Sequence, residues 1–446
     1  MKNLILQLGS NNWQRPYESA PGSGLLHEAY HLALNTRQDT RCSSIYPSPM
    51  QTSEQEDYKV FRIAHSIPIC EGISPVSTYR WHDMSENEFS TYRRRLEREV
   101  YRWMEEIEAR LGQNFTMMIA HHAFINPLVL RDVNRRRIRC GKPSVPLFCF
   151  IHGTALKMFC NELERHPEYP FRFHPLMIEE KIFDEGNVSG CFAVSANTID
   201  VMKRTFPNFP AEKIYLTPCG IDERCFHPRE GLDLRQYLAK LGQSLWPGGF
   251  IAPGDFDYLL IFAGKFAQWK RIDALLKAAA IYERHLPRLC TLVVGAGPVS
   301  LMEQYFAQAR KLGLRATFFM GSRDQVTLAE LFALADVSVF PSFEEPFGMV
   351  FMEAMACGCP VIGVNSGGPR EFVSPAVGEL VPEFGARVLD PLAKAIAATV
   401  QRAIGENWKT NKAPACMDLV CGNYTISQQV DKLLSLALSV IGELDE

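Results

Sequence analysis

Two glutamates, Glu345 and Glu353, are the first residues of this sequence that could do chemistry. Seven residues separate them, and an apolar run that ends at Pro341 precedes them. A helix is expected to open around Phe347-Gly348, which places Glu345 just before it and Glu353 two turns inside. Carboxylates accept hydrogen bonds from sugar hydroxyls, and a helix N-terminus with a glycine attracts phosphate. As an isolated pair, the same glutamates are also typical of ordinary helix charges.

Three cations form a second group of candidate residues. Lys265, Lys270 and Arg271 follow the apolar run 258–263 within seven residues. Two fixed cations beside a diphosphate would neutralise the charge that develops as it leaves. For Lys270-Arg271 alone, solvated residues at a helix start are the alternative interpretation.

Taken together, these segments resemble the retaining nucleotide-sugar glycosyltransferases of the GT-B fold, specifically family 4. The signature of that family is two glutamates separated by seven residues, with Phe-Gly between them and Glu-Ala-Met-Ala following. Here it occurs at Glu345 and Glu353, and the segment 360–371 matches the same family. The resemblance is close over residues 256–375 and loose over the rest of the chain.

The resemblance implies a set of site residues and a retained anomeric configuration. The family usually has an arginine and then a lysine in its cationic loop, and here Lys265 and Lys270 stand at those positions. Lysine keeps the charge but loses the bidentate fork of arginine, and Arg271 is an alternative cation. The implied catalytic residues are His152, Lys265, Lys270 and Glu345. The implied substrate-binding residues are Gly22, Gly24, His122, Gly264, Arg271, Gly297, Gly321, Phe347, Gly348, Met349, Val350 and Glu353.

Histidines at two predicted strand ends are candidates in the first half of the chain. His152 follows the run 146–151, where the family places a histidine beside the transferred sugar, although a lone histidine is usually a core residue. His121 and His122 follow the run 116–120. A histidine pair could suggest a metal, but no third ligand is spaced to complete a site. One of the two is therefore interpreted as lining the acceptor site, and we expect no metal and no cofactor beyond the nucleotide sugar.

Short apolar runs alternate with helical patterns twice along the chain, which predicts an α/β protein with two parallel sheets. Strands are expected at 2–8, 116–120, 146–151, 191–194, 213–217, 258–263, 290–294, 317–320, 337–340 and 361–364. Helices are expected at 25–34, 90–111, 127–136, 196–206, 232–241, 271–283, 299–312, 328–335, 347–357, 391–404 and 427–444.

The pattern predicts two doubly wound Rossmann-like domains that face each other across a cleft, with ligands at the carboxyl ends of the strands. We expect an acceptor-binding domain, a connection, a nucleotide-sugar-binding domain and a last helix that returns to the first domain. Their predicted bounds are 1–228, 229–257, 258–426 and 427–446.

Composition excludes several other classes of protein. The chain has 446 residues, 47% hydrophobic and 22% charged, with a net charge of −3. These values are typical of a soluble globular protein and disfavour a nucleic-acid partner. No window approaches a membrane span, and the 13 scattered cysteines favour buried thiols in a cytoplasmic chain. The arginine-rich segments 93–95 and 131–142 could contact an anionic membrane or an anionic acceptor, or form a solvated face.

The expected reaction is transfer of a hexosyl group from a sugar nucleotide, with a UDP-sugar favoured, to an acceptor that the sequence does not identify. Another sugar-nucleotide activity of this fold, such as an epimerase or a phosphorylase-like enzyme, is an alternative. An inactive sugar-nucleotide-binding protein is a third interpretation. Consumption of donor without any acceptor would distinguish the epimerase or a hydrolase from a transferase. The sequence leaves the oligomeric state open.

Overall fold

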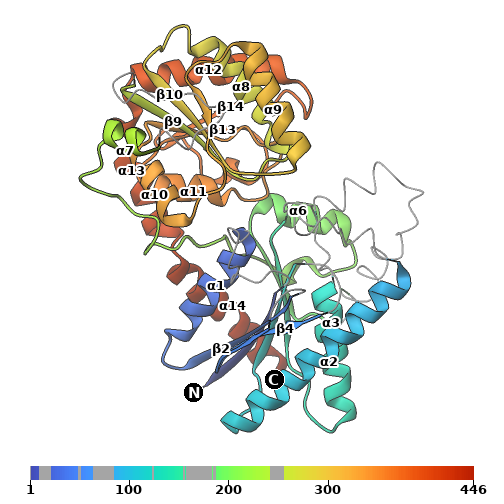
Figure 1. The fold of residues 1–446 in the computed structure, drawn as a ribbon. Helices are drawn as coiled ribbons and strands as arrows, with labels where there is room; N and C mark the ends of the chain where they lie inside the picture. The colour runs from blue at the N-terminus through green and yellow to red at the C-terminus, as the bar shows by residue number, and fades with distance from the viewer. Residues whose placement is uncertain are drawn as a thin grey trace. The chain divides into compact units, whose positions relative to one another are not determined.

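The structure, a computed structural model, consists of two units, each built on one parallel sheet (Figure 1). The first unit contains Met1–Gly220 and Ile426–Glu446, and the second contains Ile221–Thr425. The described residues are 2–9, 22–48, 52–63, 85–122, 125–153, 156, 183, 187–241 and 256–445. Within the predicted connection 229–257, residues 242–255 lie outside this part of the chain.

The sheet of the first unit has the order β3-β4-β2-β1-β5-β6-β7-β8. Its strands are β1 (Asn3–Leu8), β2 (Thr40–Ser48), β3 (Ser53–Glu54), β4 (Tyr58–Arg62), β5 (Met117–His121), β6 (Leu147–Ile151), β7 (Gly190–Ala193) and β8 (Ile214–Leu216). All neighbours are parallel except β3 and β4. The chain builds outward from β1 in both directions, so the strand order reverses between β1 and β5.

Helices cover both faces of this sheet (Figure 1). They are α1 (Gly22–Asn35), α2 (Glu86–Leu111), α3 (Ile125–Arg139), α6 (Ala196–Thr205) and α14 (Ile426–Asp445). Helix α2 begins with a capping box between Ser85 and Glu88 and ends at Gly112, whose φ of 63° favours glycine. Its buried stripe includes Trp103, whose indole N–H donates to Ser43 Oγ of β2 at 2.8 Å.

The second unit has a six-stranded parallel sheet in the order β11-β10-β9-β12-β13-β14. Its strands are β9 (Tyr258–Ala263), β10 (Leu289–Val294), β11 (Thr317–Phe319), β12 (Val337–Val339), β13 (Val361–Val364) and β14 (Gly378–Val381). Its helices are α7 (Leu234–Leu241), α8 (Ile272–Tyr282), α9 (Val299–Leu312), α10 (Gln325–Leu334), α11 (Met349–Ala356), α12 (Leu389–Gly405) and α13 (Trp408–Asn423). Here the strand order reverses between β9 and β12.

The last helix, α14, belongs to the first unit, as the sequence predicted. It packs against α1, and Arg37 at the end of α1 anchors it. The Arg37 guanidinium donates to Asp431 Oδ1 at 2.8 Å and to the Ser427 carbonyl at 2.9 Å. A segment from the end of the chain therefore completes the unit that the beginning of the chain forms.

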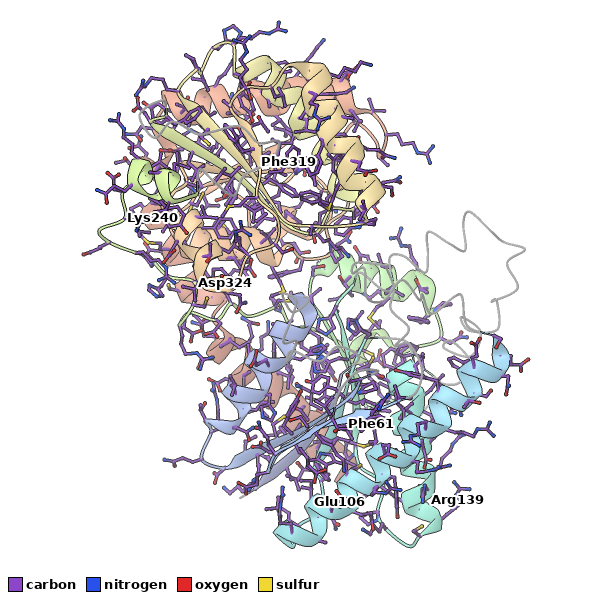
Figure 2. The ribbon with its side chains drawn as sticks, viewed as in Figure 1. Phe61, Glu106, Arg139, Lys240, Phe319 and Asp324 are labelled. Atoms are coloured by element: carbon purple, nitrogen blue, oxygen red, sulfur yellow. The ribbon has the colours of Figure 1, made fainter. Side chains whose placement is uncertain are left out.

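The arginine-rich segments of α2 and α3 lie against carboxylates. Arg93 pairs with Asp132 at 2.5 Å, Arg136 with Glu97 at 3.4 Å, and the fully buried Arg137 with Glu108 at 2.9 Å. Glu106 and Arg139 lie on the exposed surfaces of the same two helices (Figure 2). Much of the positive charge in these segments is thus matched by α2 and α3 themselves. Among the described helices, none is both long and apolar enough to cross a membrane.

Candidate active site

The loops after β9 and β12 meet at the place where the strand order of the second sheet reverses. In open α/β sheets, ligands bind at the carboxyl ends of the strands at such a switch point. The loop after β9 carries Lys265 and Lys270, and the loop after β12 carries Glu345. The topology therefore brings together two segments that lie about 75 residues apart in the sequence.

Glycines join the loops that follow β9, β10 and β11. Gly264 N–H donates to the Val294 carbonyl at 3.0 Å, and Gly295 N–H donates to the Gly321 carbonyl at 3.0 Å. A Cβ on Gly295 would lie 1.8 Å from the Gly264 carbonyl oxygen, and one on Gly297 would lie 2.4 Å from that of Phe266. Only residues without side chains permit this approach. These glycines thus shape the edge of the sheet at which the candidate residues lie.

Lys270 and Glu345 form a buried ion pair. Lys270 Nζ donates to Glu345 Oε2 at 2.6 Å, and each residue is 8% exposed. The Trp269 ring lies between the two lysines of the loop, with its centroid 4.2 Å from Lys270 Nζ and 5.4 Å from Lys265 Nζ. The ring face favours both ammonium groups through its quadrupole. Both lysines of the loop thus lie near one aromatic ring, and one of them also pairs with the Glu345 carboxylate.

Backbone contacts hold the loop that carries Glu345. Phe343 N–H donates to the Trp269 carbonyl at 2.8 Å, and Gly368 N–H donates to the Glu345 carbonyl at 2.8 Å. Glu344 has a positive φ of 46°, which is uncommon for a residue with a side chain and often marks functional sites. A Cβ on Gly367 would lie 2.3 Å from the Glu345 carbonyl oxygen. The segment after β13 therefore fixes the backbone of Glu345.

Arg271 makes contacts that differ from the diphosphate contact suggested by the sequence. Its guanidinium donates to both carboxylate oxygens of Glu383 at 2.9 Å, and its Nε donates to the Pro341 carbonyl at 2.6 Å. It is 1% exposed and has a positive φ of 49°. The bond to Pro341 connects the loop after β9 to the loop after β12, and the bonds to Glu383 connect it to the segment after β14. Arg271 thereby positions the two loops that hold Lys270 and Glu345.

Glu353 lies inside α11, and burial raises the pKa of its carboxyl to about 7, while Lys270 lowers it. The helix begins at Met349 with Gly348 before it, and Gly348 has a positive φ of 103°. Met349 and Val350 are partly exposed in the first turn.

The side chain of Phe347 is 5% exposed. Its ring packs against Phe372 and Tyr424, with centroid distances of 5.6 and 6.1 Å. Phe347 therefore fixes the start of α11 through a cluster of three aromatic rings.

Four histidines gather at the carboxyl edge of the first sheet. His121 ends β5, His122 follows it, His152 follows β6, and His27 lies on α1. His121 Nδ1 is 3.0 Å from His152 Nε2, and His27 Nε2 is 3.4 Å from the same atom. Burial lowers the pKa of His27, His121 and His152 well below the usual value and that of His122 to about 4. All four rings are therefore neutral at pH 7.

The sequence interpretation missed His27, because nothing in the pattern of the first helix distinguishes it from a core residue. His27 could have been predicted from its place in the helix that follows β1, next to the point where the strand order reverses.

Gly22 and Gly24, which were expected in a loop before that helix, lie in its first turn instead.

Residues 252–412 match the family described as Glycosyl transferases group 1. The second unit carries a group 1 glycosyl transferase domain. The chain is 32% identical over 200 residues to a D-inositol 3-phosphate glycosyltransferase of Thermomonospora curvata, covering 43% of this chain and 45% of the relative. It is 36% identical over 267 residues to an enzyme of the same name from Kribbella flavida, covering 57% of each. The matches thus span about half the length of these relatives.

Solved structures similar to this one show that the fold is GT-B. A sucrose-phosphate synthase from Thermosynechococcus elongatus has a TM-score of 0.71 at 19% identity, with 99% of this chain and all of that chain covered. Anabaena Alr3699/HepE in complex with UDP and glucose has a TM-score of 0.62 at 17% identity, with 97% of this chain and 99% of that chain covered. The two-sheet architecture predicted from the sequence is therefore confirmed.

The group 1 glycosyl transferase domain contains all the candidate residues of the second unit, from Gly264 to Glu353. The histidine cluster lies outside the matched residues. The family match thus includes the lysines and glutamates but not the histidines.

Proposed function

We propose that the chain is a retaining glycosyltransferase that moves a hexosyl group from a UDP-sugar to a hydroxyl or another nucleophile of an acceptor. The observation that carries this proposal is the Lys270–Glu345 ion pair at the switch point of the group 1 glycosyl transferase domain. A uridine donor is supported by the similar fold of a protein solved with UDP and with UDP-glucose.

In this proposal, Lys265 and Lys270 bind the diphosphate of the donor. Negative charge grows on the diphosphate as the bond to the sugar breaks, and fixed ammonium groups stabilise it without reorganisation. Glu345 accepts a hydrogen bond from the buried Lys270 Nζ at 2.6 Å, so this lysine has an acidic partner in the second unit. The diphosphate would then share Lys270 with Glu345.

Glu345 and Glu353 have different roles in this mechanism. We assign Glu345 to the sugar, because it adjoins the cation on the leaving group. We assign Glu353 to the hydroxyls of the ribose, because carboxylates accept hydrogen bonds from neighbouring hydroxyls. Neither carboxylate is assigned as a nucleophile, so departure and attack take place on the same face of the sugar.

Donor binding in this mechanism requires no metal ion, since the two lysines supply the charge that a divalent ion supplies elsewhere. The first unit is proposed to recognise the acceptor through residues that include His122. The backbone of Gly22 and Gly24 is proposed to approach the sugar or the diphosphate of the donor. His152 is proposed to act on the transferred sugar, from its place at the carboxyl end of β6.

A cytoplasmic location is the last part of the proposal. Several cysteines, among them Cys149, Cys191 and Cys359, are fully buried thiols within or beside strands. Such thiols are typical of proteins in reducing compartments.

Calorimetry with UDP, GDP, ADP and their sugar derivatives, followed by mass spectrometry of products with candidate acceptors, tests the function. We expect UDP to bind the wild-type protein more tightly than GDP or ADP, and one hexosyl unit to be added to an acceptor. Binding without any product would favour the inactive binder. Loss of the donor without an acceptor would instead indicate hydrolysis or epimerisation, and either outcome would contradict the proposal.

The matched control is Lys277→Ala. Lys277 is the next lysine after Lys270, and its ammonium pairs with Asp390 at the surface, at 2.5 Å. This variant removes one lysine from α8 and should keep wild-type UDP affinity and turnover. Lys270→Ala should lose turnover.

A further inference from the structure

Three imidazole nitrogens in the first unit point at one another. His121 Nδ1 lies 3.0 Å and His27 Nε2 lies 3.4 Å from His152 Nε2. One ring nitrogen from each of the three residues lies within 4.8 Å of the others. The residues come from α1, from the end of β5 and from the residue after β6, so two neighbouring strands and a helix fix the positions.

Hydrogen bonds alone do not satisfy this arrangement. A ring nitrogen of a neutral imidazole has either one proton to donate or one lone pair to accept with. His152 Nε2 can therefore make one good hydrogen bond, whereas two ring nitrogens approach it. One of the two close nitrogen contacts therefore remains without a hydrogen bond, which is costly in a largely buried place.

A tetrahedral metal ion would satisfy all three nitrogens at once. Zinc–nitrogen bonds of about 2.0–2.1 Å place two ligand nitrogens of a tetrahedron about 3.3 Å apart. The two separations that involve His152, 3.0 and 3.4 Å, lie on either side of that value, and the nitrogens of His27 and His121 lie within 4.8 Å of each other. We propose that His27, His121 and His152 bind a divalent transition-metal ion of the zinc class.

The donor atoms determine which metals fit. Mg²⁺ and Ca²⁺ prefer oxygen ligands, whereas Zn²⁺, Co²⁺, Ni²⁺ and Cu²⁺ accept imidazole. Three protein ligands leave the fourth tetrahedral position open. His27 and His121 are 0% and 1% exposed, but His152 is partly exposed. The open position therefore lies on the side of His152, from which an ion could enter.

The outer nitrogens of two rings set the expected strength of binding. His27 Nδ1 and His121 Nε2 are buried and have no hydrogen-bond partner among the described residues. Metal-binding histidines usually donate this second N–H to a carbonyl or a carboxylate, and loss of such a partner typically costs 10–100-fold in affinity. We therefore expect binding weaker than that of a closed structural zinc site.

This site shares His152 with the proposed mechanism, in which His152 acts on the transferred sugar, but it contains none of the residues proposed to bind the diphosphate. The lysines for the diphosphate belong to the second unit, and the three histidines belong to the first. The sequence argued against a metal because no third ligand was spaced beside His121 and His122. The structure supplies His27 and His152, which lie far from them in the sequence.

Metal titration of the 446-residue protein, without donor or acceptor, tests the proposal. Co²⁺ added to metal-free protein should give the strong visible absorption of tetrahedral cobalt, saturating at one ion per chain. Zn²⁺ should abolish this absorption and raise the melting temperature. The variants His152→Gln and His27→Gln should each lose the absorption and the rise in melting temperature.

The control is His227→Gln, which removes an exposed histidine of the second unit. It should bind Co²⁺ like the wild type. An octahedral cobalt spectrum from the wild type, a stoichiometry well below one, or full binding by His152→Gln would each overturn the proposal. If His27→Gln does not fold, the wild-type spectrum and the His152→Gln variant still test the metal site. Neither measurement depends on transferase activity, so the result is independent of the proposed function.

Discussion

Lys270 Nζ and Glu345 Oε2 lie 2.6 Å apart, although the two residues come from loops after different strands. Each side chain is about nine-tenths buried, so the ion pair lies largely out of contact with water. Removing one partner of such a pair leaves an uncompensated charge, which is strongly destabilising. The pair therefore couples the stability of the second unit to its proposed chemistry.

Replacing Lys270 by alanine should lower kcat by roughly 10²–10³, the usual effect of losing one group that stabilises developing charge. The variant should also be less stable than the wild type, because the 2.6 Å ion pair between Lys270 and the buried Glu345 is lost. Steady-state kinetics and urea unfolding measure the two effects. A variant that keeps more than half of its activity would remove Lys270 from the mechanism.

The double variant Lys270→Ala/Glu345→Gln separates these effects. Because it has neither buried charge, it should recover part of the stability that Lys270→Ala loses. Its activity should remain low. Recovery of activity together with stability would show that the lysine acts through folding alone.

The two glutamates should differ in their effects on nucleotide affinity. Glu353→Gln should weaken UDP binding by about 1.5–3 kcal/mol, the usual value for a hydrogen bond to a charged group. Glu345→Gln should reduce turnover of the sugar nucleotide more than it reduces UDP binding. Calorimetry with UDP and kinetics with the UDP-sugar test this division, and equal losses of UDP affinity in both variants would contradict it.

The raised pKa of Glu353 predicts a pH dependence. Its carboxyl has a pKa of about 7 in the folded protein, against 4.5 for an ordinary glutamate. The folded state thus holds a proton that the unfolded state has released, and the free energy of unfolding should fall as the pH rises from 4.5 to 7. UDP affinity should rise between pH 6 and pH 8, as the carboxylate forms. Glu353→Gln should lack both the fall in the free energy of unfolding and the rise in UDP affinity that come from this carboxyl. If the variant keeps the pH profiles of the wild type, the assignment is refuted.

Strands and helices with a clear apolar pattern could be predicted from the sequence. Strand β9 and helix α9 have the bounds that the apolar pattern predicted. Strands β2 and β14 were missed, since the buried Ser43 and Ser44 make β2 look polar and β14 is short. Helix α13 was missed because it contains Pro414 and has no clear apolar stripe.

The candidate site could be predicted only where its residues are close in sequence. Lys265, Lys270, Glu345 and Glu353 were identified from their spacing and their neighbours. Their pairing was not, because contact between Lys270 and Glu345 depends on the order of strands in the sheet. His27 was not predicted either, because its approach to His121 and His152 also depends on the order of the strands in the sheet.

Chelation should leave the UDP affinity unchanged, because lysines rather than a divalent ion are proposed to bind the diphosphate. Calorimetry in EDTA and in excess Mg²⁺ should give the same dissociation constant. Loss of UDP binding in EDTA, restored by Mg²⁺ or Mn²⁺, would refute the lysine-based mechanism.

His152→Ala should also bind UDP normally, since the nucleotide is assigned to the second unit, while transfer to the acceptor falls.

Arg271→Lys distinguishes a positioning residue from a diphosphate ligand. Lysine keeps the charge but cannot make the two-pronged contact with Glu383 and also reach the Pro341 carbonyl. Unpaired buried groups should lower the free energy of unfolding by about 1–3 kcal/mol. Turnover should fall because the loops that hold Lys270 and Glu345 lose their connection, while UDP affinity changes little. If Arg271 were instead a ligand of the diphosphate, UDP affinity would fall while the unfolding curve stayed that of the wild type.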